Sequence, residues 1–219
     1  MPFARIHVLA ALVGVSALLG GCNAMAFPAY VLAGAAPAKT QKAEFDGLRG
    51  QTVAIVVYCG LDVSYEFRNI DIRWDLGMVL REEMVKNVKD CRIADPLRVA
   101  RYQDQNTHWD TSPMPQIGRD LQADYVLYVS LLEFTTREPG STNLARGRIE
   151  AQLSLWNTHP DKGTDGCVWR KENVSVIYPK EGPIPATAAD VGPLRIATER
   201  LFADLVAKNF YDYKLPKED

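Results

Sequence analysis

Two apolar runs without polar alternation limit what this chain can fold into. They span residues 52–58 (TVAIVVY) and 125–134 (YVLYVSLLEF). A strand that is apolar on both faces belongs in the interior of a parallel or mixed sheet, where other elements cover both sides. We therefore expect both runs near the centre of a mixed sheet with helices packed against it.

The segments between these runs predict an α/β pattern. Residues 72–88 repeat apolar side chains along one helical face, with Asp71 as the N-cap, and residues 91–94 read as a short second strand. Strand, helix and strand in this order predict a βαβ unit at the start. Residues 61–69 are expected to be a loop, and residues 96–106 and 116–122 are expected to be helices.

The second half of the chain changes to an antiparallel pattern. Residues 148–156 alternate between apolar and polar, and residues 167–178 form the return strand after a turn-rich stretch. This predicts a late hairpin with one solvent-facing side and a bulge near residues 170–173. A last amphipathic helix is expected from about residue 188 or 194 to 211, with a broad apolar stripe that includes Leu194, Leu201 and Phe202. The predicted fold class is α/β (α+β), with a mixed sheet of about five strands.

The N-terminal 21 residues have the three parts of an export signal. Arg5 precedes an apolar run at residues 8–19, and Gly20 and Gly21 follow it. The run is shorter than the roughly 20 residues that a membrane-spanning helix needs, so it predicts a signal peptide. An ordinary secretory signal with a chance cysteine after it is the alternative interpretation.

The stretch Leu19-Gly20-Gly21-Cys22 resembles the lipobox of bacterial lipoproteins. In that family the cysteine sulfur carries diacylglycerol with acyl chains such as palmitate, and the leader is cut before the cysteine. The resemblance implies lipidation of Cys22 and a stable membrane anchor. Two or more acyl chains keep a protein at a membrane, whereas a single chain binds only marginally. Asn23, rather than Asp, implies an outer-membrane lipoprotein that faces the periplasm.

The expected domain organisation follows from this leader. We expect a lipoprotein signal peptide at residues 1–21 and an Ala- and Pro-containing tether at 22–43. A single α/β domain at 44–213 and a polar tail at 214–219 complete the chain.

Residues 117–127 (IGRDLQADYVL) resemble the approach to a central strand in a group of envelope proteins. The group includes the N-terminal domain of the Tol-system propeller protein, the curli secretion lipoprotein and the lipoprotein activator of penicillin-binding proteins. Residues 45–50 and 210–213 also resemble planctomycete-type lipoproteins. The resemblance implies a non-catalytic envelope domain and assigns no binding residues.

Composition and motifs exclude several functional classes. Lys and Arg number 25 against 27 Asp and Glu, without a basic block, so nucleic acid is not an expected partner. The chain lacks a nucleophile elbow, a P-loop, a dinucleotide fingerprint and zinc-ligand spacing, so we predict no enzyme activity, cofactor or metal. Cys59, Cys91 and Cys167 allow one disulfide, most readily through Cys167, or buried thiols.

A candidate interaction surface follows from the expected topology. Ligands of open α/β sheets bind beyond the carboxyl ends of the parallel strands. The loops after residues 58 and 94 should meet there, and aromatic and arginine side chains are the usual interface anchors. The candidate residues are Tyr65, Phe67, Arg68, Tyr102 and Trp109. A local core that pins two long loops would use the same residues.

The partner expected for this surface is another envelope protein or a cell-wall component. One alternative is a hydrolase of an envelope polymer, which needs a deep pocket with convergent carboxylates. A second alternative is a structural, ring-forming subunit of a trans-envelope transporter. His108 beside Asp110 could act as a base, but we expect a loop packed by Trp109.

Overall fold

The computed structural model describes residues 39–67 and 69–215, which fall into two units. The main unit spans Gln41–Tyr213. The other unit includes the described residues 39–40 and 214–215, where the Leu215 N–H donates to the Lys39 carbonyl at 2.9 Å. Two short strands, β1 (Thr40–Gln41) and β8 (Tyr213–Lys214), form a two-stranded sheet. The predicted signal peptide, Cys22 and most of the predicted tether lie outside the described residues.

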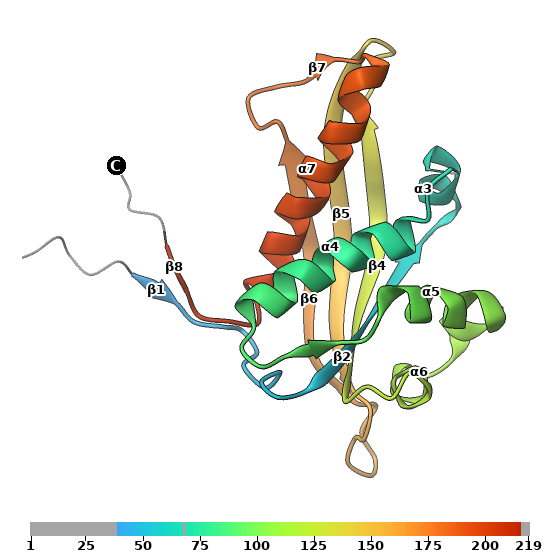
Figure 1. The fold of residues 1–219 in the computed structure, drawn as a ribbon, viewed down its shortest axis with the longest axis vertical. Helices are drawn as coiled ribbons and strands as arrows, with labels where there is room; N and C mark the ends of the chain where they lie inside the picture. The colour runs from blue at the N-terminus through green and yellow to red at the C-terminus, as the bar shows by residue number, and fades with distance from the viewer. Residues whose placement is uncertain (1–38, 68, 216–219) are drawn as a thin grey trace, which may run out of the picture. The chain divides into compact units, whose positions relative to one another are not determined.

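The main unit is built on a six-stranded mixed sheet with the order β3-β2-β4-β5-β6 and β7 paired to β5 (Figure 1). The strands are β2 (Thr52–Cys59), β3 (Arg92–Ile93), β4 (Tyr125–Arg137), β5 (Leu144–Asn157), β6 (Cys167–Tyr178) and β7 (Ile184–Pro185). β2 runs parallel to β3 and β4, and β5 runs antiparallel to β4, β6 and β7. The predicted mixed sheet and the interior positions of β2 and β4 are therefore confirmed.

Five helices and a 3-10 turn are described around the sheet. They are α3 (Leu61–Glu66), α4 (Ile72–Asn87), α5 (Pro96–Gln105), η1 (Trp109–Thr111), α6 (Met114–Asp120) and α7 (Ala188–Ala207). Asp71 caps α4 as predicted, because its side chain accepts from the Arg73 N–H. The prediction of a loop at residues 61–69 is wrong for residues 61–66, which form α3. Val63 and Phe67, one helical turn apart, are both buried and hold α3 as a helix.

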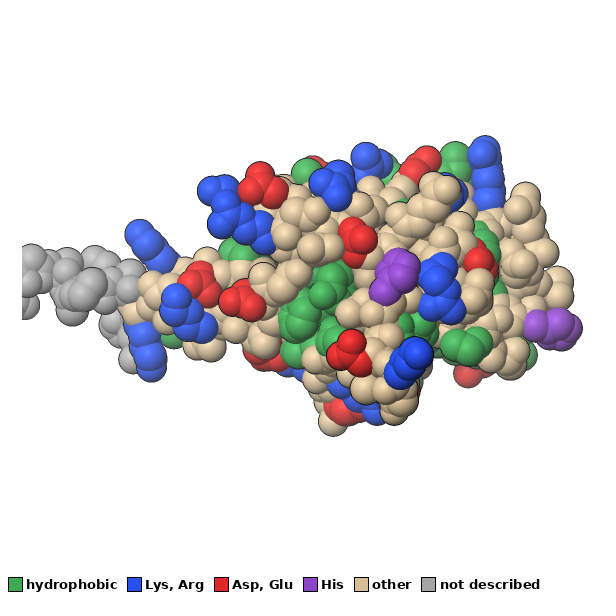
Figure 2. Space-filling model, turned by 90° about the horizontal axis from the view of Figure 1, so that it is seen from below, with side chains coloured by type: hydrophobic (Ala, Val, Ile, Leu, Met, Phe, Trp, Pro, Cys, Tyr) green, Lys and Arg blue, Asp and Glu red, His purple; other side chains and the backbone are tan. Residues whose placement is uncertain are grey.

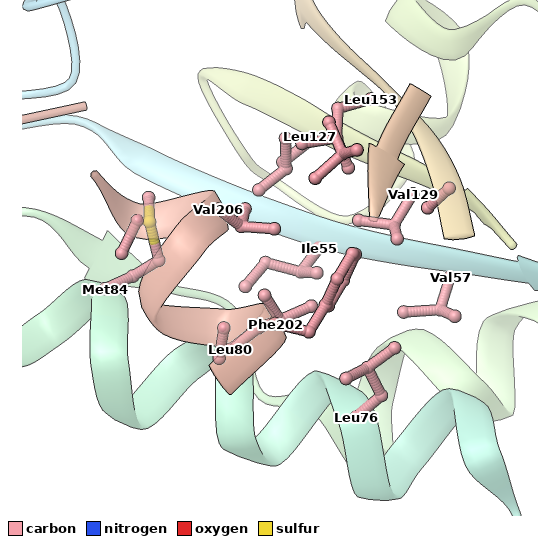
Figure 3. Packing of buried hydrophobic residues seen from close by; sticks show 14 of the residues in the cluster. Ile55, Val57, Leu76, Leu80, Met84, Leu127, Val129, Leu153, Phe202 and Val206 are labelled. Carbon is pink, nitrogen blue, oxygen red and sulfur yellow. The ribbon is translucent and has the colours of Figure 1, made fainter. Parts of the chain in front are cut away.

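Helices α4 and α7 pack together on one face of the sheet (Figure 1). The core between them and the strands is shown in Figure 3. Ile55 and Val57 of β2 meet Leu76, Leu80 and Met84 of α4 and Phe202 and Val206 of α7. All seven side chains are almost fully buried. The burial of this apolar surface is the main driving force for the assembly of this layer.

The last helix departs from the predicted stripe in two ways. Leu194, Phe202 and Val206 are buried, but Leu201 is 36% exposed, so the apolar stripe is narrower than expected. The helix also ends at Ala207 instead of residue 211. The side-chain amide of Asn209 donates to the backbone carbonyls of Leu205 and Val206 in the last turn. The backbone carbonyl of Asn209 accepts the N–H groups of residues 44 and 45. These bonds end the helix and hold the start of the main unit against it.

Helices α5 and α6 cover only part of the opposite face. Val99 of α5 and Met114 and Ile117 of α6 pack on Ala54 of β2 and Val126 of β4. Along β5 and β6 the same face is open to solvent, with Gln152 and Arg170 exposed. The predicted hairpin with one solvent-facing side is confirmed. The expected bulge is present where the β5–β6 register shifts between residues 151 and 153, next to Asn173 with φ 54°.

The surface charge is mixed in sign, and the three cysteines of the main unit are not joined by a disulfide. Figure 2 shows Lys and Arg intermixed with Asp and Glu on one face, in line with the net charge of −2. No disulfide joins Cys59, Cys91 and Cys167 to one another, so the expected bridge through Cys167 is not formed. Burial raises the pKa of the Cys91 thiol to about 11.

A membrane-spanning helix is not found among residues 39–67 and 69–215, because no helix there has the necessary length and apolar character.

Candidate functional site: a groove at the end of β2

A groove of about 550 Å³ lies where β2 ends, at the carboxyl edge of the parallel strands. Its walls come from three places in the sequence: the end of β2, the connection between α3 and α4, and the η1 turn. We call it the β2-end groove. Its lining residues are Tyr58, Cys59, Phe67, Asn69, Ile70, Asp71, Ile72, Arg73, Thr107, Trp109 and Asp110.

Two aromatic rings form one wall of the β2-end groove. The rings of Tyr58 and Trp109 meet edge to face, with centroids 6.0 Å apart and an interplanar angle of 64°. Both side chains are half-buried. This geometry is the favourable one for aromatic pairs, so the two rings present a fixed, partly exposed apolar surface.

Hydrogen bonds from α5 position the loop that carries Trp109. The Gln103 side-chain amide donates to the Val57 carbonyl at 3.0 Å and fixes the end of α5 against β2. The Asn106 side chain donates to the Tyr102 carbonyl, and the Trp109 N–H donates to the Asn106 carbonyl. The indole is therefore held by backbone geometry and by its contact with Tyr58.

Phe67 and Ile70 also line the groove. Phe67 is only 6% exposed, and its ring packs on Phe134 of β4 with centroids 4.6 Å apart. Ile70 is 39% exposed. Phe67 thus belongs to the core, whereas Ile70 contributes exposed apolar surface to the groove.

The five predicted surface residues do not all come together. Phe67 and Trp109 line the same groove, but Tyr102 is absent from its lining. The Tyr102 hydroxyl donates to Asp120 at 2.9 Å, and burial together with this carboxylate raises the pKa of Tyr102 to about 12. Arg68 and the side chain of Tyr65 lie outside what the structure describes.

One guanidinium organises the polar rim. Arg73 lies 2.9 Å from Asp71 and 2.8 Å from Asp104, so it joins the start of α4 to α5. Burial opposes ionisation of Asp71, but the bonds from Arg73 and from backbone N–H groups outweigh it and lower the pKa of this carboxyl. The hydrogen bond with Asp71 raises the pKa of Arg73. The rim therefore carries fixed charges of both signs.

The chemistry of the groove favours binding over hydrolysis. Its carboxylates are Asp71 and Asp110, and Asp71 is already engaged by Arg73. A glycosidase-type mechanism needs two carboxyl groups that act as acid and as base or nucleophile on the same bond. His108 is not among the lining residues. In the described part of the chain, no cluster of three His, Cys, Asp or Glu residues could hold a metal ion.

A neighbouring hollow of about 570 Å³ shares Phe67, Asn69 and Ile70 with the β2-end groove. Two of its charged side chains, Glu66 and Arg195, are used by the fold. Glu66 accepts from the Thr135 hydroxyl and the Thr136 N–H, which ties α3 to β4. Arg195 is paired with two carboxylates of the helix layer. The β2-end groove, with its half-exposed aromatic wall, is the stronger candidate for recognition.

Sequence reasoning missed Tyr58 and the segment from Ile70 to Arg73 as parts of the site. In the sequence, Tyr58 reads only as the last residue of a strand. An aromatic residue at the carboxyl end of a parallel strand could have indicated a binding site there. Asp71 was identified only as a helix cap. In the structure it is also half of the charged rim.

Comparisons with known proteins give a likeness of fold only. No protein-family model matches this chain, and no curated protein matches it. Lipoprotein GNA1162 from Neisseria meningitidis is 13% identical, with 70% of this chain and 98% of that chain covered and a TM-score of 0.39. PelC from Paraburkholderia phytofirmans, crystallised as a dodecamer, is 10% identical, with 79% and 97% covered and a TM-score of 0.38. The LpoB C-terminal domain from Salmonella enterica is 15% identical, with 61% and 87% covered and a TM-score of 0.28. Structural neighbours of this chain thus include a bacterial lipoprotein.

Proposed function

We propose that this chain is a lipid-anchored lipoprotein of the bacterial outer membrane that faces the periplasm. In this proposal it binds another envelope component through the β2-end groove and catalyses no reaction. The observation that carries the binding role is the half-exposed Tyr58–Trp109 ring pair, which lines one groove with Ile70 at the carboxyl edge of the parallel strands.

The anchor is supported by the sequence. Cys22 follows an apolar leader and two glycines, which is the arrangement of a lipobox. Acyl chains on this residue would hold the chain at a membrane surface, and the stretch 22–43 would connect the anchor to the main unit. The main unit would then act close to the membrane to which it is attached.

The groove has the composition of a protein-binding surface. Aromatic side chains and arginine dominate the energetics of such interfaces, surrounded by polar groups that exclude water. Trp109, Tyr58 and Ile70 supply the apolar centre, and Arg73 with its two carboxylates supplies the rim. The expected partner is an envelope protein that inserts an apolar side chain and presents polar groups to Arg73 and Asp110.

Affinity capture from solubilised envelopes tests the binding role. Ile70→Ala removes groove surface, and Ile196→Ala is a matched control because Ile196, on α7, is 41% exposed and lines no part of the groove. We expect Ile70→Ala and Trp109→Ala to reduce recovery of the same partner about tenfold, and Ile196→Ala to leave it unchanged. Equal recovery by all of them would refute the role of the groove.

The mass of the native protein tests the anchor separately. A chain that begins at Cys22 and carries acyl groups is the expected product, and Cys22→Ser should abolish the modification. An unmodified sulfur, or a chain that retains residues 1–21, would contradict the anchor without affecting the result for the groove.

A further inference from the structure

The open face of the sheet carries a second hollow, and Asp110 is the one lining residue that it shares with the β2-end groove. It measures about 340 Å³ and lies over β4, β5 and β6, on the face opposite α4 and α7. We call it the sheet-face hollow. The side chains that matter for its chemistry are Tyr128, Ser130, Gln152, Trp156, Arg170 and Glu172.

Strand register brings these side chains together. Tyr128 of β4 pairs with Ser154 of β5, which pairs with Arg170 of β6. Ser130 pairs with Gln152 in the next row. Adjacent strands lie about 4.8 Å apart, so the row across three strands extends about 10 Å over the sheet.

The bulge in β6 completes the second row. Ala151 pairs with Val174 and Leu153 pairs with Lys171, so two residues of β6, Glu172 and Asn173, oppose Gln152. A bulge changes the direction of the side chains in the bulged strand. Here it places the Glu172 carboxylate in the lining of the hollow, together with the Gln152 amide.

Two aromatic rings are held in this hollow by their polar ends. The Trp156 indole N–H donates to the Ser154 hydroxyl at 2.8 Å. Burial raises the pKa of the Tyr128 hydroxyl, against the effect of its hydrogen bond with Ser130. Both rings pack partly on the core beneath α6 and remain half-exposed. They form a rigid apolar surface that costs little entropy to order when a ligand binds.

The polar groups beside the rings have unused hydrogen-bonding capacity. Gln152 and Glu172 are exposed, and their side chains make no hydrogen bond or ion pair with any residue of the described part of the chain. An amide supplies two donors and an acceptor, and a carboxylate supplies two acceptor oxygens. Asp110 and Glu172 outnumber the Arg170 cation, so the lining of the hollow carries an excess of negative charge.

From this combination we propose that the sheet-face hollow binds an uncharged saccharide chain. A sugar ring presents C–H groups on its faces and hydroxyls at its edges. The rings of Trp156 and Tyr128 cover the faces, and the planar groups of Gln152, Glu172 and Arg170 bond the hydroxyls. The excess of negative charge from Asp110 and Glu172 does not favour a phosphorylated ligand, and the row across the strands suits an extended chain.

Titration calorimetry with the full chain, purified in a detergent without a sugar headgroup, tests this inference. The probes are chitotetraose, cellotetraose and maltotetraose. We expect at least one of them to bind, with affinity reduced about tenfold by Trp156→Ala and about threefold by Gln152→Ala. Trp74→Ala is the matched control, because Trp74 is exposed on α4 and does not line the hollow.

The choice of variants separates recognition from folding. Gln152→Ala removes a side chain without partners in the described residues, so the fold is retained even if Trp156→Ala loosens the core. Absence of binding to all three saccharides overturns the inference, as does equal affinity of the wild type, Trp156→Ala and Gln152→Ala. Equal loss in Ile70→Ala also overturns it, because Ile70 lines the β2-end groove and not the sheet-face hollow.

Discussion

Glu199 gives the most direct test of the energetics in the helix layer. Its side chain lies in α7 at 1% exposure, and the Arg195 Nη1 atom is 2.5 Å from its carboxylate. The same nitrogen is 2.9 Å from Asp75 of α4. One buried cation is therefore shared by two carboxylates, which leaves an excess of negative charge between the two helices.

Burial raises the pKa of Glu199 from about 4.5 to about 7, although Arg195 opposes this shift. A carboxyl whose pKa is higher in the folded than in the unfolded state stabilises the fold fully below about pH 4.5. That contribution is lost as the pH rises through about 7. At 1.36 kcal/mol for each pKa unit, the shift of the Glu199 pKa from about 4.5 to about 7 amounts to about 3 kcal/mol of unfolding free energy.

Glu199→Gln removes the charge and keeps the size and a hydrogen-bond acceptor. We expect the advantage of the variant over the wild type to grow by about 2.5 kcal/mol as the pH rises from 5 to 8. Urea unfolding of both proteins at pH 5, 6, 7 and 8 measures this change. Glu82→Gln, at an exposed position on α4, should follow the wild type at every pH.

The opposite pH dependence would refute this reasoning. If the wild type gained stability over Glu199→Gln as the pH rose from 5 to 8, Arg195 would outweigh burial and the carboxylate would stabilise the fold. A difference that does not change with pH would mean that Glu199 does not titrate in this range.

Three further substitutions test the packing and the caps. Phe202→Ala should reduce the free energy of unfolding by about 3–5 kcal/mol, because the Phe202 side chain is fully buried. Leu61 is 89% exposed, so Leu61→Ala should change this free energy little in the same urea experiment. Gly147→Ala should destabilise by about 1–3 kcal/mol, since an added Cβ would overlap the Thr198 side chain where α7 crosses β5, and a thermal melt measures this. Asp71→Ala should cost about 1 kcal/mol through loss of the α4 cap, seen as a lower urea midpoint with an unchanged slope.

The layered fold could be predicted because β2 and β4 are apolar on both faces. That pattern requires cover on both sides and places the two strands in the interior of the sheet. Helix α3 could not be predicted in the same way. Its six residues are too few for a period, and it is held by the burial of Val63 and Phe67, which is a tertiary effect.

The candidate site was predictable only where topology decides position. The carboxyl ends of parallel strands meet at one edge, which brings Phe67 and Trp109 into one groove. Tyr102 turns instead toward Asp120 of α6, and this bond depends on how two helices pack. The sheet-face hollow depends on a bulged register between β5 and β6, which the residue pattern locates only approximately.

Site-specific crosslinking in intact cells tests the central claim most directly, that the β2-end groove holds an envelope partner. A photoreactive residue in place of Thr107, which lines the groove, is compared with one in place of Ile196, which does not. The account predicts one specific adduct from position 107 that is lost in Trp109→Ala, and no such adduct from position 196. The same adducts from both positions, or none from position 107, would contradict it.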